Sequence, residues 1–150
     1  MIDLSKLTTL VLESCSRLDT SLPLLTARAV KGYSLRSLTV RTELVDDELP
    51  QKLEAFICAL TDLTDLCLLF EGDSPGVSTE QILKVHGKTL KTVFIDSRYA
   101  PGSPSEADFS ESLPWDYLDS IHRYCPNIVE LGVSLDWDSI VTSEFELGEV

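Results

Sequence analysis

The chain has 150 residues, of which 43% are hydrophobic, so its size and composition are those of one globular domain. Acidic residues outnumber basic residues by 25 to 12, and the resulting net charge of -13 disfavours binding to nucleic acid or to an anionic membrane surface. Its apolar runs fall well short of the roughly 18 residues of a membrane span, and the N-terminus lacks the basic region of a secretory signal, so an intracellular protein, cytoplasmic or nuclear, is expected.

The four cysteines, Cys15, Cys58, Cys67 and Cys125, include no C-x-x-C pair. In a cytosolic chain, reduced and buried thiols are the favoured interpretation, and a disulfide or a metal site is the alternative.

One apolar pattern recurs five times along the chain. It reads LTTLVL from Leu7, LRSLTV from Leu35, LTDLCL from Leu63, LKTVFI from Leu90 and IVELGV from Ile128, with starts 28, 28, 27 and 38 residues apart. Near-constant spacing of this length is typical of a repeat array. The pattern predicts strands near 7–13, 35–41, 63–69, 90–96 and 128–134.

Each gap between these strands is expected to contain a helix, because parallel strands need a crossover connection. SLPLLTARAV in the first gap is the shortest of these segments. DDELPQKLEAFICAL in the second has an apolar stripe at helical spacing, made of Leu49, Leu53, Phe56, Ile57 and Leu60. The fourth gap is longer because residues 98–112, rich in Pro, Ser and acidic residues, predict an exposed loop insertion.

Several residues mark the expected helix ends. Asp46 and Ser112 are N-cap candidates, Ser78 followed by Gln81 is a capping-box pattern, and Gly87 suits the end of the third helix.

The pattern resembles a leucine-rich repeat of the ribonuclease-inhibitor-like type. The run YCPNIVELGV, a helix end with Cys-Pro-Asn before the last strand, is similar to repeats of F-box leucine-rich-repeat proteins, especially fungal ones. The resemblance implies an α/β solenoid of about five strand–helix units over residues 1–135, with a parallel sheet on the concave side and helices on the convex side. Residues 136–150 would form an acidic C-terminal cap or tail.

In that family, an Asn or Cys at the ninth position of each repeat hydrogen-bonds to the turn backbone. This chain departs from the family at that position. The position is occupied by Cys15, Glu43, Glu71, Arg98 and Asp136. Only Cys15 fits, so irregular turns are expected along that edge.

No residues with the spacing of a catalytic site were found. His86 and His122 both fall in expected outer helices without a partnering motif, and a catalytic role is the less favoured interpretation for each. The acidic residues Asp46, Asp47 and Glu48 are better explained by the dipole of the following helix than by calcium binding. We therefore expect neither enzymatic activity, nor a cofactor, nor a metal site.

The concave face of the sheet is the expected site of partner binding. Apolar residues that neighbour one another by register, with charged residues around them, make up the candidate surface: Phe94, Leu69, Cys67, Arg41, Asp96 and Asp65. The alternative is that the 98–112 loop or a segment outside the chain covers these residues.

The favoured function is a protein–protein interaction module, the substrate-recognition repeat region of an F-box-like ubiquitin-ligase adaptor or a fragment of one. A GTPase-activating-type regulator or an enzyme built on the same repeats is an alternative, and so is a structural fragment without independent activity. Open ends of the repeat array would also allow self-association.

Overall fold

The computed structural model describes residues 6–30, 32, 34–43, 48–71, 77–98 and 115–133. Strands and helices alternate throughout these residues. In chain order they are β1 (Thr9–Glu13), α1 (Leu18–Ala29), β2 (Ser37–Glu43), α2 (Leu49–Ala59), β3 (Asp65–Glu71), α3 (Thr79–His86), β4 (Thr92–Arg98), α4 (Trp115–Tyr124) and β5 (Glu130–Val133).

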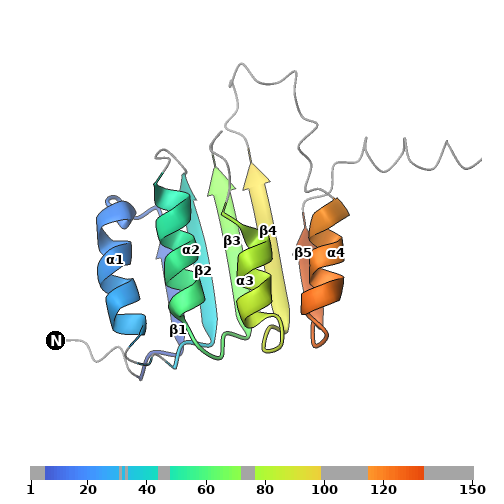
Figure 1. Ribbon diagram of the computed structural model, residues 1–150. Helices are drawn as coiled ribbons and strands as arrows, with labels where there is room; N and C mark the ends of the chain where they lie inside the picture. Colours follow the sequence, from blue (N-terminus) through green and yellow to red (C-terminus); the bar gives the residue numbers. More distant parts are fainter. Residues whose placement is uncertain are drawn as a thin grey trace, which may run out of the picture.

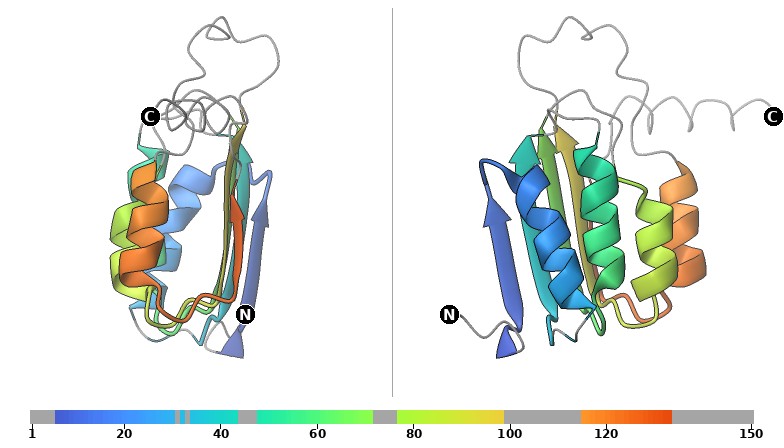
Figure 2. Two further views of the ribbon diagram at one scale, coloured as in Figure 1. Left: turned by 90° about the vertical axis from the view of Figure 1, so that its right-hand side faces the viewer. Right: turned by 60° about the vertical axis from the view of Figure 1, so that its left-hand side comes forward.

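The five strands form one parallel sheet in the order β1-β2-β3-β4-β5, so each strand pairs with its neighbours in sequence. All four helices lie on one face of this sheet, as Figures 1 and 2 show. The α/β class and the parallel sheet predicted from the repeat are thereby confirmed. We call the face of the sheet without helices the open face; its described positions are 9, 11, 13, 37, 39, 41, 43, 65, 67, 69, 92, 94, 96, 130 and 132.

Each strand begins two residues later than predicted, and a repeated hydrogen-bond arrangement explains the difference. The backbone N–H groups of Arg36 and Ser37 both donate to the carbonyl oxygen of Thr8, at 2.8 and 3.0 Å. The same two-to-one arrangement recurs at the carbonyl oxygens of Arg36, Thr64 and Lys91. The first apolar residue of each pattern therefore lies in the turn before the strand, with its side chain against the core.

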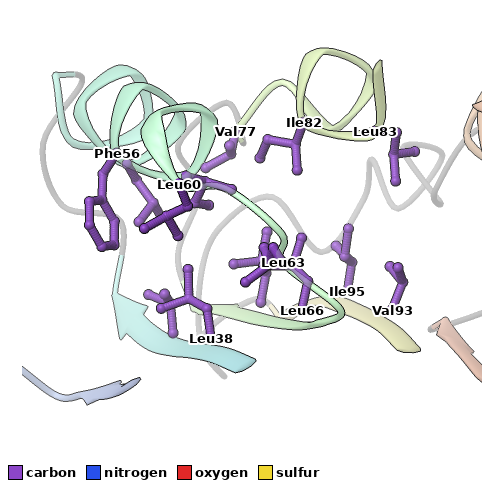
Figure 3. Packing of buried hydrophobic residues seen from close by; sticks show 14 of the residues in the cluster. Leu38, Phe56, Leu60, Leu63, Leu66, Val77, Ile82, Leu83, Val93 and Ile95 are labelled. Atoms are coloured by element: carbon purple, nitrogen blue, oxygen red, sulfur yellow. The ribbon is translucent and has the colours of Figure 1, made fainter. Parts of the chain in front are cut away.

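The core lies between the sheet and the helix layer. The predicted stripe of α2 is buried throughout, with Phe56 and Leu53 completely so. In Figure 3, Phe56 lies on the helix side of this core, and Leu38 and Leu66 lie on the sheet side. Burial of one such side chain stabilises the fold by about 1.5–3 kcal/mol. The apolar residues of the repeat thus join the two layers along the whole sheet.

The helix ends differ in detail from the predictions. Ser78 is the N-cap of α3 but its side chain makes no capping hydrogen bond, so the expected capping box with Gln81 is not formed. Gly87 is the C-cap of α3 in the ordinary right-handed helical conformation, with φ -55°. Glycine is required there for space, because a Cβ atom would collide with the carbonyl oxygen of Tyr124 at the end of α4.

The first helix is longer than the sequence suggested: α1 has 12 residues and includes Pro23. Asp46, Ser112, residues 99–112 of the expected loop and residues 136–150 of the expected tail lie outside the described residues. Within the described ranges, no helix has the length and apolar character needed to cross a membrane.

Candidate functional site

The strand register places all six predicted partner-binding residues on the open face. Its first row across the sheet contains Asp65, its second contains Cys67 beside Phe94, and its third contains Arg41, Leu69 and Asp96 in that order. The side chains come from the neighbouring strands β2, β3 and β4. Each of the six residues comes two, four or six positions after the first residue of the recurring pattern. Side chains two positions apart on a strand point to the same face, so the pattern predicts that the six share one face.

Phe94 is the most exposed apolar member of the set, at 39%, whereas Cys67 and Leu69 are half-buried. Its ring extends over β5: a Cβ atom on Gly132 would collide with Cδ2 of Phe94 and lie 2.5 Å from Cε2. A glycine within a strand often marks such a close approach. That glycine is the signal in the sequence that could have predicted this contact.

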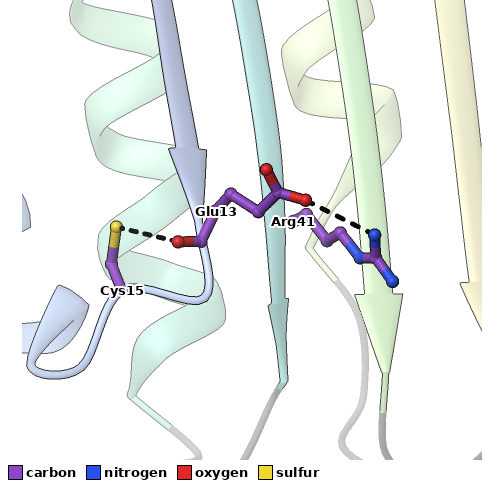
Figure 4. Close-up of polar contacts among 3 residues, drawn as sticks. All are labelled: Glu13, Cys15 and Arg41. Carbon is purple, nitrogen blue, oxygen red and sulfur yellow. Dashed lines mark hydrogen bonds and ion pairs between the residues drawn. The ribbon is translucent and has the colours of Figure 1, made fainter.

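Charged and thiol groups lie at the β1 end of the open face (Figure 4). Nη1 of Arg41 is 3.4 Å from Oε1 of Glu13, and both side chains are more than half exposed, so the pair contributes at most about 1 kcal/mol. The Cys15 thiol donates to the carbonyl oxygen of Glu13 over 3.6 Å. Cys15 itself is exposed, so the expectation of a buried thiol is wrong at this position, which lies in the turn after β1.

Two of the predicted carboxylates are less accessible than a binding surface requires. Asp96 is only 2% exposed, so the expectation that it flanks the surface as an accessible charge is wrong. Its short side chain lies on the same face as the larger Phe94, two residues earlier, and Leu69, directly across the ladder. Asp65 is half-buried, and its Oδ2 accepts a 2.6 Å hydrogen bond from the Thr64 hydroxyl.

Negative charge dominates the open face. Its described side chains include one guanidinium, Arg41, and five carboxylates: Glu13, Glu43, Asp65, Asp96 and Glu130. Asp96 is buried, so a ligand on this face meets the other four carboxylates around an apolar centre.

The two histidines lie in different environments on α3 and α4. His86 is 3% exposed, and its Nε2 donates a 2.8 Å hydrogen bond to the carbonyl oxygen of Ile57 in α2. Because a carbonyl oxygen only accepts, Nε2 must carry the proton. Burial lowers the pKa of His86, and the bond to Ile57 opposes that effect. His122 is exposed on α4, so His86 is a packing residue and His122 a surface residue.

The other three cysteines are unsuited to nucleophilic chemistry. Burial raises the pKa of Cys58, Cys67 and Cys125, and the nearby Glu54 carboxylate adds to the effect at Cys58. These thiols are therefore protonated at neutral pH, and the thiol is a poor nucleophile compared with the thiolate. Among the described residues, no group of His, Cys, Asp or Glu side chains has the arrangement of a metal site.

A shallow groove runs along the edge at which the strands begin. Three cations, Arg36, Lys88 and Lys91, line it together with Asp62. Helix C-termini, each carrying about half a negative charge, lie at the same edge and offset much of this positive charge. The groove is therefore better explained by stabilisation of helix ends than by anion binding.

Comparisons with protein families, with curated proteins and with solved structures gave no match for this chain.

Proposed function

We propose that this chain is a protein-binding region built from leucine-rich repeats, with a solenoid architecture in which the open face is the concave side. Support comes from the regular strand–helix alternation, the constant strand register and the hydrogen-bond arrangement that recurs at successive strand starts. We propose no catalytic activity for it.

One observation carries the binding function. Phe94, Leu69 and Cys67 lie side by side on the open face and retain solvent exposure, while the four helices all cover the opposite face. Adjacent apolar side chains that keep contact with solvent are typical of a surface that binds another protein.

The proposed biological role is substrate recognition in an F-box-like ubiquitin-ligase adaptor. Its support is the run YCPNIVELGV, which is similar to repeats of F-box leucine-rich-repeat proteins. In the structure this run extends from the end of α4 through β5. An F-box encoded in the same open reading frame would support this role, and a different effector module in that position would contradict it.

The open face is too small to bind tightly by itself. Five strands spaced about 4.8 Å apart and about 17 Å long give roughly 320 Å² in projection. A standard interface takes about 800 Å² from each partner. A tight complex therefore requires additional surface, so we expect this region alone to bind weakly.

Site-specific photocrosslinking in cells tests the proposal. A benzoyl-phenylalanine placed at Leu69 or at Phe94 should capture the same partner, whereas the same group at Asp119, exposed on α4 in the helix layer, should not. Phe94→Ala should then weaken binding of the purified partner by about 2 kcal/mol if the ring is an anchor. A partner captured only from Asp119, or one whose affinity is unchanged in the folded Phe94→Ala, Leu69→Ala double variant, would contradict the assignment.

A further inference from the structure

We propose that Phe94 and Glu130 form a receptor for an arginine side chain in an extended segment of a partner protein. This inference rests on the proposed function, because it specifies the chemistry that the open face recognises. Two observations carry it: the contact of the Phe94 ring with the backbone of β5, and the position of Glu130 on that same strand.

The Phe94 ring lies against the backbone of β5 at Gly132. Its Cδ2 and Cε2 atoms occupy the space in which a side chain of residue 132 would begin, so one face of the ring packs against the backbone of Gly132. The ring nevertheless remains 39% exposed. A supported aromatic ring loses little conformational freedom when a ligand stacks on its exposed side.

Glu130 lies within reach of a group stacked on that ring. It precedes Gly132 by two residues on β5, a separation of about 6.6 Å along a strand, and both residues belong to the open face. Glu130 is exposed, and within the part of the chain that the structure describes no cationic side chain forms an ion pair with it. Its carboxylate is thus available to a ligand.

An aromatic ring beside a carboxylate selects for a cation, and for arginine above other cations. The ring face attracts positive charge, and a planar guanidinium can stack on the ring while its edge donates hydrogen bonds to a carboxylate. Lysine has the charge but lacks the planar group, and an acidic segment would be repelled.

The surroundings favour the same ligand at longer range. Arg41, the only basic side chain among the described open-face positions, already pairs with Glu13, and the whole chain carries a net charge of -13. Such a field accelerates the approach of a basic segment and repels an acidic one. Leu69 and Cys67 on β3 then provide an apolar surface for a neighbouring side chain of the bound segment.

A matched peptide series tests this receptor in the full chain. The probe is acetyl-Gly-Leu-Gly-Arg-Gly-Leu-amide, and the comparison peptides carry citrulline or lysine in place of the arginine. Titration followed by ¹H–¹⁵N correlation spectra should give saturable shifts at the amides of Gly132 and Glu130, with millimolar affinity for the arginine peptide. The citrulline peptide, which has the same shape without the charge, should bind about tenfold more weakly, because the cation–π contact and the ion pair are lost together.

Three variants separate the parts of the receptor. Glu130→Gln should reduce the preference for arginine over citrulline several-fold and leave citrulline binding unchanged. Gly132→Ala should displace the ring without removing it and weaken both peptides. Asp119→Asn removes an exposed carboxylate from α4 and should change neither affinity. If Gly132→Ala does not fold, Phe94→Leu keeps an apolar side chain and removes the ring, so it should reduce the preference for arginine to the part that Glu130 supplies.

Equal affinity for the arginine and citrulline peptides would overturn the receptor and leave open-face protein binding intact. Shifts confined to residues outside β4 and β5, or no saturable shift at Gly132, would overturn it as well. The proposed function is judged separately by photocrosslinking, which does not depend on these peptides.

Discussion

The glycine at the end of α3 offers the sharpest test of the packing. Gly87 has φ -55° and ψ -31°, a conformation that alanine adopts freely. On backbone grounds alone, Gly87→Ala should stabilise the protein by about 0.4–1 kcal/mol, because alanine restricts the unfolded chain. The surroundings predict the opposite result.

A Cβ atom at position 87 would collide with the backbone oxygen of Tyr124 and lie 2.7 Å from the Tyr124 carbonyl carbon. The Cβ atom would also lie 2.5 Å from the carbonyl oxygen of Leu83 in α3. Backbone atoms cannot rotate away as a flexible side chain can, so α3 must move away from α4 and its last turn must adjust. Overpacking of this kind costs about 1–3 kcal/mol. After subtraction of the entropic gain, Gly87→Ala should lower the free energy of unfolding by about 1–2 kcal/mol, measured by urea denaturation.

Gly32 provides a matched control, because its backbone conformation, and not a lack of space, favours glycine. Its φ is 96°, and within the part of the chain that the structure describes no atom lies within 4 Å of a Cβ atom built on it. Gly32→Ala should cost about 1–2 kcal/mol through backbone strain, and Gly32→Asn should recover part of that loss because asparagine tolerates positive φ. Gly87→Asn should recover nothing. A Gly87→Ala variant as stable as the wild type, or more stable, would refute the close approach of α3 and α4.

Three further predictions follow from buried and exposed groups. His86 has a lowered pKa in the folded state, so its contribution to stability is complete above its ordinary pKa of 6.5 and is lost as the pH falls through the lower folded value. His86→Gln should therefore reduce the slope of stability against pH below 6.5. Cys15 should react with a thiol reagent in the native protein well before Cys125, which is 3% exposed and has a raised pKa, and mass spectrometry of labelled peptides showing the reverse order would contradict their placement. Phe56→Ala removes a completely buried ring and should cost about 3–5 kcal/mol in thermal or urea unfolding; a cost below 1 kcal/mol would contradict its position in the core.

The sequence predicted the register of the sheet because the apolar pattern determines which side chains can face the core. A shift of one residue in β3 would place Leu66 and Leu68, both buried, on the open face. The same reasoning predicted that Phe94 and Cys67 are neighbours. Strand starts were placed two residues early, because an apolar residue in a turn can point into the core as well as one in a strand.

Contacts that depend on side-chain direction were not predictable from the pattern. The Phe94 ring could have leaned toward β3 or β5, and the space above Gly132 decides the outcome. His86 was expected near a helix end, but its bond to Ile57 depends on how α3 packs against α2. The burial of Asp96 likewise depends on the neighbours of an individual side chain, which periodicity does not describe.

The order of the elements has a consequence for communication within the molecule. Among the described residues, each strand pairs only with its neighbouring strands and each helix packs only on its neighbouring helices within the helix layer, and no contact joins the β1 end to the β5 end. A change at Cys15 can therefore reach Phe94 only by passing through the intervening strands or the helices packed on them, each of which would have to move in turn. Substitutions at the two ends should be energetically independent, so the two ends of the sheet can acquire separate specificities without disturbing each other.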